Sequence, residues 1–442
     1  MPQGRSRHPR PASGDVRRPA DVVVAGAGPG GAAAALTLRR LGHRVVLVDK
    51  AVFPRDKCCG DGLTAAALRR LERLGLRPED VASFQPVEEA VVVSAGGRQV
   101  SLPLPAGSLF AASARRADLD AALVGLARQA GAEVLEGRAV TAVRAAPAAR
   151  DNGTAHQPPP AGVRVSLDDG TSIEAAYVVA ADGAWSPVRR SLGLTPPGYL
   201  GDWQAGRQYF EGVGPEGRKL WVWFEPDMIP GYAWSFPLPG GAANVGYGVL
   251  RPIKGRLRGQ PPDWSERPRV AAVLGPSARP SGPWRAWPIP ARIGRAPLSG
   301  LSGRVLFVGD AAGACDPMTG EGIAQAMETA EMAARAIAAA GPAQPEGAAR
   351  RYRREVLTGM AVDDLLSRLL CWVLARPGGS DRALALVDRS GWTRGNFARW
   401  MFEDYPRAVL ATPHRWHRRL FSSPGAYAGC EQPGWPGSGA PR

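Results

Sequence analysis

The sequence predicts an α/β protein in which a Rossmann-like domain is combined with an antiparallel β-sheet domain and a C-terminal helical region. Residues 21–31 run from an apolar strand into a glycine-rich turn, and an Ala-rich helix follows, which is typical of a dinucleotide-binding unit. Aromatic, alternating segments between residues 198 and 250 are typical of an antiparallel sheet. A chain of 442 residues with 45 % hydrophobic residues is long enough for two or three domains.

The glycine-rich turn has the spacing Gly26-x-Gly28-x-x-Gly31. The first glycine allows a tight turn, the second lets the backbone approach a pyrophosphate, and the third lets the helix pack on the strand. A second apolar strand at residues 45–49 ends in Asp49, where a carboxylate can accept a hydrogen bond from a ribose 2′-hydroxyl. The unit is therefore expected to bind a dinucleotide, with the phosphates at the helix N-terminus.

The rest of the first domain follows in order. Residues 53–63 are expected to form a loop because they are rich in Pro and Gly, and an Ala/Leu/Arg helix is expected from there through Leu74. We expect a helix at residues 114–131, strands at 134–143, 163–167, 172–179 and 304–310, and a helix at 323–340. The Pro/Gly/Asn-rich insert at 145–162 predicts a long hairpin loop.

The antiparallel domain is assembled from two parts of the chain. Its predicted strands are residues 87–93, 98–104, 203–210, 220–224, 232–236 and 243–249, and residues 251–281 are expected to be connection. The predicted boundaries are 20–80, 106–195 and 285–340 for the Rossmann-like domain, 81–105 and 196–284 for the antiparallel domain, and 341–425 for the helical region. Residues 1–19 and 426–442 are expected to be disordered tails.

The net charge of +15 comes mostly from arginine and suits an anionic partner, such as a membrane surface or a diphosphate. Nucleic acid is not the expected partner, because no basic helix with interleaved aromatic residues accompanies the charge. The five cysteines are odd in number and lack paired spacing, which argues against a disulfide scaffold or a metal site and favours a reducing cytoplasm.

A secretion signal is the alternative explanation of the N-terminus, since Arg17-Arg18 precedes an apolar run. Five residues interrupt that run, namely Gly26, Gly28, Pro29, Gly30 and Gly31. The sequence also lacks a charge-free span of about 18 residues that could cross a bilayer. The sequence therefore predicts a cytoplasmic protein, either soluble or peripheral on the inner face of the cell membrane.

Three separated segments, residues 26–31, 182–189 and 309–322, together resemble the FAD enzymes built like para-hydroxybenzoate hydroxylase. In that family the Gly-Asp aspartate hydrogen-bonds the flavin ribityl chain, and a Pro-x-x-Gly-x-Gly loop directs main-chain donors toward the isoalloxazine ring. The resemblance implies an FAD-binding domain and assigns cofactor-binding roles to Arg116, Asp182, Gly309, Asp310, Pro317, Gly320 and Gly322. Backbone N–H groups at the N-terminus of the following helix suit the negative charge of a reduced flavin.

Two further segments resemble a narrower family. Residues 57–63 and 230–237 are similar to the Cys-Gly-x-Gly-Leu loop and the Tyr-x-Trp-x-Phe-Pro strand of the geranylgeranyl reductases, and residues 53–63 are especially like the actinobacterial branch, which includes menaquinone reductases. These enzymes saturate isoprenoid double bonds in chlorophyll side chains, archaeal lipids and menaquinones. The resemblance implies FAD-dependent reduction of an isoprenoid chain on a lipid or quinone. One departure is Leu238, which stands where the family's strand continues into Lys-Gly.

Alkene reduction needs a hydride and a proton, and an isolated alkene must receive that proton in a dry, apolar slot. Cys59 is the candidate catalytic residue, either as proton donor or as a group that positions the substrate, and Cys58 is expected to be structural. The candidate substrate-binding residues are Gly60, Asp61, Gly62, Tyr232, Trp234 and Phe236.

Several alternatives remain open from the sequence. An aromatic hydroxylase of the same fold would consume NADPH and oxygen, and a non-catalytic protein would bind flavin or lipid without turnover. A halogenase is disfavoured, because the Cys-Gly-Asp-Gly loop replaces the Gly-Glu-Ser type of segment of those enzymes. The electron donor can be NADPH, ferredoxin or a quinol, and the oligomeric state is open. The C-terminal helices, with Trp392, Trp400 and Trp416, either contact anionic lipid or cover the substrate domain.

Overall fold

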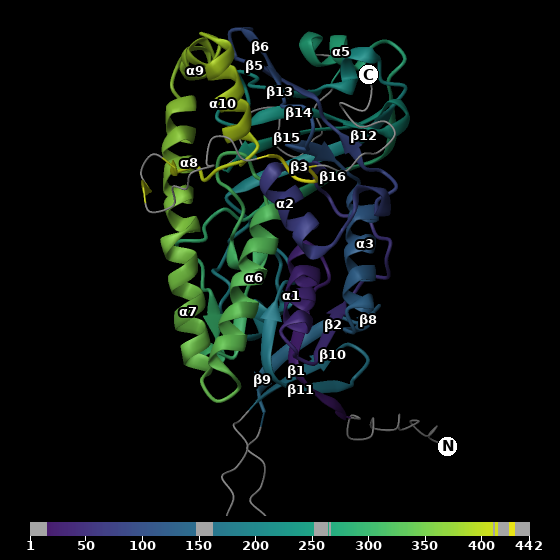
Figure 1. Cartoon of the computed structure of the whole chain (residues 1–442), viewed down its shortest axis with the longest axis vertical. Helices are drawn as coiled ribbons and strands as arrows, with labels where there is room; N and C mark the ends of the chain where they lie inside the picture. The colour runs from purple at the N-terminus through teal and green to yellow at the C-terminus, as the bar shows by residue number, and fades with distance from the viewer. Residues whose placement is uncertain are drawn as a thin grey trace, which may run out of the picture.

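The structure is a computed structural model that describes residues 16–146, 162–251, 264, 267–409, 412–413 and 424–428. Two large sheets lie toward opposite ends of the long axis of the molecule (Figure 1). Helices α7 (Pro345–Thr358) and α8 (Met360–Leu374) follow one another along one side, from the level of the first sheet toward the second.

The eight-stranded sheet has the order β17-β18-β11-β1-β2-β8, and β10 and β9 extend it from β11. β1 pairs in parallel with both β2 and β11. Val22, Val23 and Val24 of β1 are all fully buried, so the strand is covered on both faces. The strands are β1 Val16–Ala25, β2 Val45–Asp49, β8 Glu133–Glu136, β9 Val140–Ala145, β10 Val163–Leu167, β11 Ser172–Ala180, β17 Ser299–Gly300 and β18 Val305–Phe307.

Helices α1 (Pro29–Arg40), α3 (Arg116–Gln129) and α6 (Ile323–Ala340) complete the Rossmann-like domain, and α1 packs against both of the others. The parallel sheet confirms the predicted fold class of this domain. Two details differ from the sequence prediction. β1 begins at Val16, within the stretch assigned to the N-terminal tail, and the single strand expected at 134–143 is two strands. Gly137, with φ +66°, lies between these two strands, and such a turn conformation ends a strand.

The insert predicted as a hairpin loop lies mostly outside the described residues, which end at 146 and resume at 162. The strands on either side of it, β9 and β10, pair antiparallel with Ala145 opposite Val163.

The seven-stranded sheet has the order β16-β12-β15-β14-β13-β5-β6. Both predicted parts of the antiparallel domain therefore meet in one sheet, although β5 and β13 pair in parallel. Its strands are β5 Glu89–Val93, β6 Gln99–Pro103, β12 Trp203–Glu211, β13 Leu220–Trp223, β14 Tyr232–Leu238, β15 Ala242–Leu250 and β16 Arg279–Ile289.

The sequence predicted that residues 251–281 form only a connecting segment, and this prediction is wrong for part of the range. They contain helix α5 (Pro268–Leu274) and the start of β16, which continues to Ile289 and so extends past the predicted domain boundary at 284. β16 lies at the edge of its sheet, where prolines such as Pro280 and Pro283 are tolerated because one side of an edge strand has no ladder to complete. The strand was therefore not predicted, because its Pro and Arg content is typical of a connecting segment.

A small third sheet joins the two domains. It has the order β3-β7-β4, from Gly62–Thr64, Ala111–Ser113 and Gln85–Pro86. Helix α2 (Ala65–Leu74) follows β3 directly, and the Thr64 side chain caps it by accepting a hydrogen bond from the Ala67 N–H. Helix α4 (Pro187–Ser191) packs near β9.

Helices α9 (Gly379–Val387) and α10 (Gly391–Met401) cover the antiparallel sheet at the top of Figure 1. Leu384 and Phe402 share a core with Val92 and Val100 of that sheet. Part of the predicted C-terminal tail is also ordered, because Ala426 bridges to Leu109 and the Tyr427 hydroxyl donates to the Leu76 carbonyl. Residues 429–442 lie outside the described residues.

Candidate active site

A cavity of about 360 Å³ lies where the two sheets and the C-terminal helices meet. The lining residues come from the glycine-rich turn, the loop at 57–64, the segment at 308–323, strand β14 and helices α8 to α10. Segments that are up to about 370 residues apart in the sequence thus form one wall. The C-terminal helices supply part of that wall, among them Val373, Leu384 and Phe397.

The glycine-rich turn has the tight geometry that its spacing predicts. Gly26 has φ +93°, and a Cβ there would lie 2.4 Å from the Ala181 carbonyl oxygen. A Cβ on Gly31 would lie 1.7 Å from the Gly26 carbonyl oxygen, so any side chain would separate the helix from the strand. Gly28 caps α1 and lines the cavity.

Asp49 fixes this turn from the end of β2. Its Oδ2 accepts the Ala27 N–H at 2.6 Å, and its Oδ1 accepts the Ala51 N–H at 2.8 Å. The predicted ribose contact would therefore use the remaining lone pairs of a carboxylate that is already oriented by the backbone.

Asp182 lies at the end of β11, next to the glycine-rich turn. Its Oδ2 accepts the Val188 N–H at 2.9 Å, whereas its Oδ1 is buried with no hydrogen-bond partner among the described residues. Burial raises the pKa of this carboxyl. Arg189, in the same segment, donates to the Ala311 carbonyl at 2.9 Å and ties the two cofactor segments together.

Gly309 and Asp310 follow β18 and line the cavity. The Asp310 carboxylate lies 3.5 Å from Lys57 Nζ, and its other oxygen accepts the Cys315 thiol at 3.3 Å. Gly320 and Gly322 line the cavity beside the N-terminus of α6. Pro317 does not; it lines a second cavity behind this segment, and its carbonyl accepts the Cys371 thiol at 3.2 Å.

These residues fit an FAD. Glycines line the cavity at two helix N-termini, where backbone N–H groups favour phosphate and reduced-flavin charge. Ala181 and Gly183, on either side of Asp182, line the cavity, and the buried Asp182 Oδ1 has no partner of its own among the described residues. Gly28 stays open, since a Cβ there would meet only arginine side-chain ends at 3.6 Å and beyond.

The cysteine loop packs directly on the aromatic residues of β14. A Cβ on Gly60 would lie 3.4 Å from Trp234, and one on Gly62 would lie 3.0 Å from Phe236. Cys59, Gly60, Gly62, Tyr232, Trp234 and Phe236 all line the cavity. The structure therefore brings together the predicted catalytic cysteine and all but one of the predicted substrate-binding residues.

Asn244 on β15 holds this arrangement in place. Its Nδ2 donates to the Cys59 carbonyl and to Asp61 Oδ2, both at 2.8 Å, and its Oδ1 accepts the Trp234 Nε1–H at 3.1 Å. Asn244 is fully buried. Sequence reasoning missed it, although a polar amide inside the apolar strand 242–250 was a usable signal.

Asp61 is the predicted substrate-binding residue that the structure does not place on the cavity wall. It is fully buried, with φ +64°, and accepts hydrogen bonds from Tyr209, Asn244 and the Arg116 N–H. Burial raises the pKa of its carboxyl, and the hydrogen bonds from Asn244 and Tyr209 oppose this rise, so that the pKa is about 6. Asp61 therefore positions the loop from behind instead of contacting a ligand in the cavity.

Arg116 lines the cavity as the family resemblance implies, and its side chain is 4 % exposed. Its guanidinium makes two hydrogen bonds to Asp120, at 2.8 and 2.7 Å. Arg55 reaches the same carboxylate at 2.9 Å. Burial raises the pKa of the Cys59 thiol, and nearby Arg116 partly offsets this rise, so Cys59 is protonated at neutral pH.

The aromatic residues divide between the two faces of the sheet. Tyr232, Trp234 and Phe236 alternate along β14 and face the cavity, as strand geometry requires of residues i, i+2 and i+4. Trp221 and Trp223 instead stack on each other at 5.6 Å in the core on the other face.

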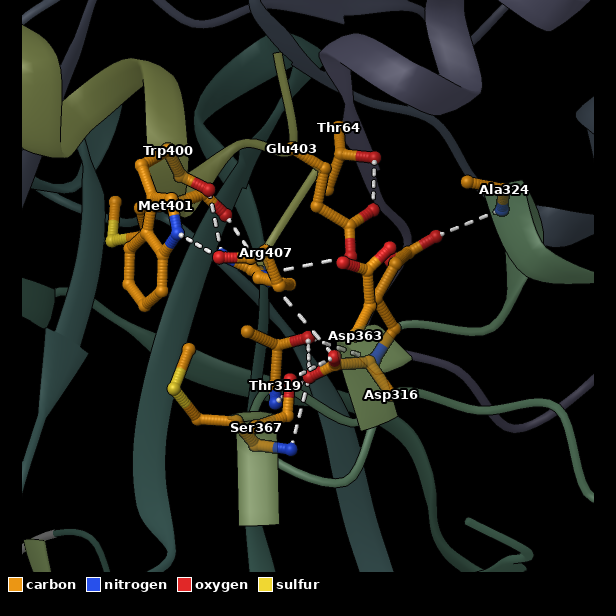
Figure 2. A network of polar contacts seen from close by, with 12 residues as sticks. Thr64, Asp316, Thr319, Ala324, Asp363, Ser367, Trp400, Met401, Glu403 and Arg407 are labelled. Carbon is orange, nitrogen blue, oxygen red and sulfur yellow. Dashed lines mark hydrogen bonds and ion pairs between the residues drawn. The ribbon is translucent and has the colours of Figure 1, made fainter. Parts of the chain in front are cut away.

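A buried polar network lies beside the cavity (Figure 2). Glu321 Oε1 accepts the N–H groups of Ile323 and Ala324 at 2.9 and 3.1 Å, at the start of α6. Glu403 accepts from Thr64 at 3.2 Å, from Gln325 at 2.9 Å and from Arg407 at 3.4 Å.

Asp316 completes this network. It accepts the Ser367 hydroxyl at 2.7 Å and lies 3.9 Å from Arg407 Nε. Burial, together with the charge of Asp316, raises the pKa of Glu321 to about 7 and that of Glu403 to about 8, although the backbone donors to Glu321 and the charge of Arg407 beside Glu403 oppose the rise. Sequence reasoning did not identify Glu321 or Glu403.

Comparison with known proteins gives concordant results. Residues 19–215 match the family model of the FAD binding domain. The menaquinone reductase of Mycolicibacterium smegmatis is 34 % identical over 73 % of this chain and 77 % of its own length. Digeranylgeranylglycerophospholipid reductase 1 of Methanopyrus kandleri is 32 % identical over 70 % of this chain and 77 % of its own length.

Among solved structures, a geranylgeranyl bacteriochlorophyll reductase-like protein of Thermoplasma acidophilum superposes with a TM-score of 0.72 at 22 % identity. The match covers 91 % of this chain and all of that protein. At this identity the likeness shows the fold.

Proposed function

Because this chain belongs to the geranylgeranyl reductase family of FAD-dependent oxidoreductases, we propose that it reduces C=C double bonds in the isoprenoid chain of a lipid or quinone. The observation that carries the proposal is that the glycine-rich FAD segments, the Cys59 loop and the aromatic residues of β14 line one and the same cavity. The relatives' printed names support the isoprenoid substrate class.

The chain's own residues would hold FAD at three places. Gly28 and Gly30 at the N-terminus of α1 suit the pyrophosphate, and Asp310 suits the ribityl chain. Gly320 and Gly322, at the N-terminus of α6, suit the isoalloxazine ring. Bound reduced FAD supplies a hydride to one carbon of the alkene.

The substrate part of the cavity is lined largely by apolar side chains. Its walls include Val92, Val222 and Phe224 from the sheet, with Phe397 and Met401 from α10 opposite. A flexible hydrocarbon chain fits such walls, whereas a small phenol would leave most of them uncovered. Exclusion of water by the same walls favours protonation of the substrate over side reactions.

Cys59 is assigned to the reactive part of this wall. Its carbonyl is fixed by Asn244, and its thiol is protonated at neutral pH because burial raises its pKa. The thiol can therefore contact the alkene without introducing a charge, as a positioning group or as a weak acid.

We further propose that the protein contacts an anionic membrane peripherally, on the cytoplasmic side, through one face of α8. Leu365, Leu369 and Trp372 are 69, 52 and 56 % exposed and share this face by their spacing. Val373, 40 % exposed, also lines the cavity, so the face adjoins the substrate site. Arg376 stacks on Trp372 at 3.8 Å and adds positive charge.

Two other sequence candidates for lipid contact have different positions. Trp400, also on α10, lines the cavity and stacks with Arg407, so it is part of the cavity wall. Trp416 lies outside the described residues, and Trp392 is 75 % exposed on α10. Among the described residues, no helix combines the length and the apolar character needed to cross a bilayer.

Lipid profiling of a host with and without the gene tests the proposed reaction. The host that carries the gene should contain prenyl chains heavier by two hydrogens, with no oxygen added. Oxygen incorporated into an aromatic ring would instead identify the hydroxylase alternative, and an unchanged lipid profile would contradict the proposal.

A further inference from the structure

Two partly buried carboxyl groups each line one of two cavities of different character. Glu321 lines the large apolar cavity, which is the proposed substrate site. Glu403 lines a second cavity of about 260 Å³, whose other lining residues include Arg69, Asp316 and Arg407. Figure 2 shows Glu403 between Thr64, which lines the substrate cavity, and Arg407, which lines the polar one.

The hydrogen bonds leave one oxygen of Glu321 suited to carry a proton. Its Oε1 already accepts two backbone N–H groups, so a proton on this carboxyl resides on Oε2. The neighbouring charges are Asp316, Glu403, Arg407 and Arg116. Burial and the adjacent carboxylates disfavour ionisation of both glutamates, so the pair retains a proton at neutral pH.

A second observation indicates that the polar cavity takes a hydrogen-bonding ligand. Arg407 has a side chain only 3 % exposed, and its Nε is buried with no hydrogen-bond partner among the described residues. Gln325 Oε1, in the same cavity, is likewise buried without a partner. Orphaned donors and acceptors around a polar cavity are the arrangement that ordered water satisfies.

We propose that Glu321 is the acid that protonates the substrate alkene, and that Glu403 and water in the polar cavity return the proton to it. The proposal rests on the proposed function, because it supplies the proton that alkene reduction requires. It assigns Cys59 the positioning role.

The step balances in atoms and electrons. The Oε2–H bond of Glu321 breaks as a C–H bond forms at one alkene carbon, while the other carbon would take the hydride that bound reduced FAD would supply. The alkene π electron pair becomes that C–H bond, and the charge left on Glu321 is removed when Glu403 passes on its proton. A proton from solvent, passed through water in the polar cavity, then reprotonates Glu403.

The test uses Glu321→Gln, Glu403→Gln and the control Glu328→Gln. Glu328 lines the same polar cavity but pairs with Arg70 at 2.8 Å and does not line the substrate cavity. Infrared difference spectra of each protein between acid and alkaline pH report protonated carboxyls without any turnover. Anaerobic single turnover with a prenylquinol, whose reduced head group does not take electrons from the flavin, then measures the rate at which the reduced protein is reoxidised.

We expect a carboxylic-acid band that titrates near neutral pH in the wild type and in Glu328→Gln, and that weakens in both other variants. Glu321→Gln should slow single turnover about 100-fold or more, as loss of a general acid does. Glu403→Gln should sustain a first turnover better than later ones.

An active wild type whose rate and infrared band are unchanged by Glu321→Gln would overturn the relay alone. A wild type that reduces no prenyl chain would overturn the proposed function and the relay with it. FAD content of each variant shows whether its site has formed, and a variant that binds no FAD is replaced by Glu321→Asp, for which we expect partial activity.

Discussion

Asn244→Ala should destabilise the active site, and the structure sets the size of the effect. The substitution removes three hydrogen bonds at once, those to the Cys59 carbonyl, Asp61 and the Trp234 indole. Trp234 is 5 % exposed and Asp61 is fully buried, so neither group gains water in exchange. Leaving buried partners unpaired costs about 1–3 kcal/mol each, and we expect a loss of about 3 kcal/mol in the free energy of unfolding.

Thermal unfolding, followed by flavin fluorescence, measures this loss, and thiol labelling measures access to Cys59. Tyr209→Phe is the matched comparison, because it removes only one hydrogen bond to Asp61, of 2.8 Å. Its destabilisation should be about half as large or less. If Asn244→Ala unfolded at the wild-type temperature, with Cys59 labelled at the wild-type rate, Asn244 would not hold the loop as described.

Three further predictions concern the cofactor, the membrane and pH. Gly31→Ala should lose FAD, since its Cβ would lie 1.7 Å from the Gly26 carbonyl oxygen. Gly125→Ala on α3 is the control and should retain FAD, because a Cβ there meets nothing within 4 Å. Flavin absorbance of the purified proteins measures the FAD content of both. The double variant Leu369→Glu and Trp372→Glu should bind anionic liposomes about 10-fold more weakly or worse. Leu41 is 46 % exposed on another surface, so Leu41→Glu should leave liposome binding unchanged. Sedimentation with liposomes measures binding of both variants. Glu321 and Glu403 have a pKa above 4.5, so the folded protein keeps protons that the unfolded chain releases. The contribution of these two groups to wild-type stability should therefore be greatest below about pH 4.5 and fall as pH rises through 7 to 8. The difference in unfolding midpoint between the wild type and Glu403→Gln should change over the same range.

Much of the fold was readable from the sequence, because local signals and tertiary structure agree there. The predicted helix at 323–340 and the predicted strand at 45–49 have the bounds of α6 and β2. Gly322 and Gly341 delimit that helix, and Asp49 ends that strand. Strand β16 was missed because its prolines are tolerated only at a sheet edge, which the sequence does not reveal.

The site was predictable where a motif carries its own geometry, as in the turn from Gly26 to Gly31. It was not predictable where partners are distant in sequence. Thr64 and Glu403 are 339 residues apart, and Asp61 and Asn244 are 183 apart, yet each pair shares a hydrogen bond. Distance in sequence also explains why the position of Asp61 was not predicted. Its motif suggested substrate contact, but hydrogen bonds from Tyr209 and Asn244 hold it behind the loop.

The most direct test of the central claim is an anaerobic reaction of the chemically reduced, FAD-loaded protein with a prenylquinol in D₂O, followed by mass spectrometry of the side chain. The account predicts one saturated double bond per turnover, with carbon-bound deuterium at the former double bond and no oxygen added. A side chain of unchanged mass after complete reoxidation of the flavin would contradict it.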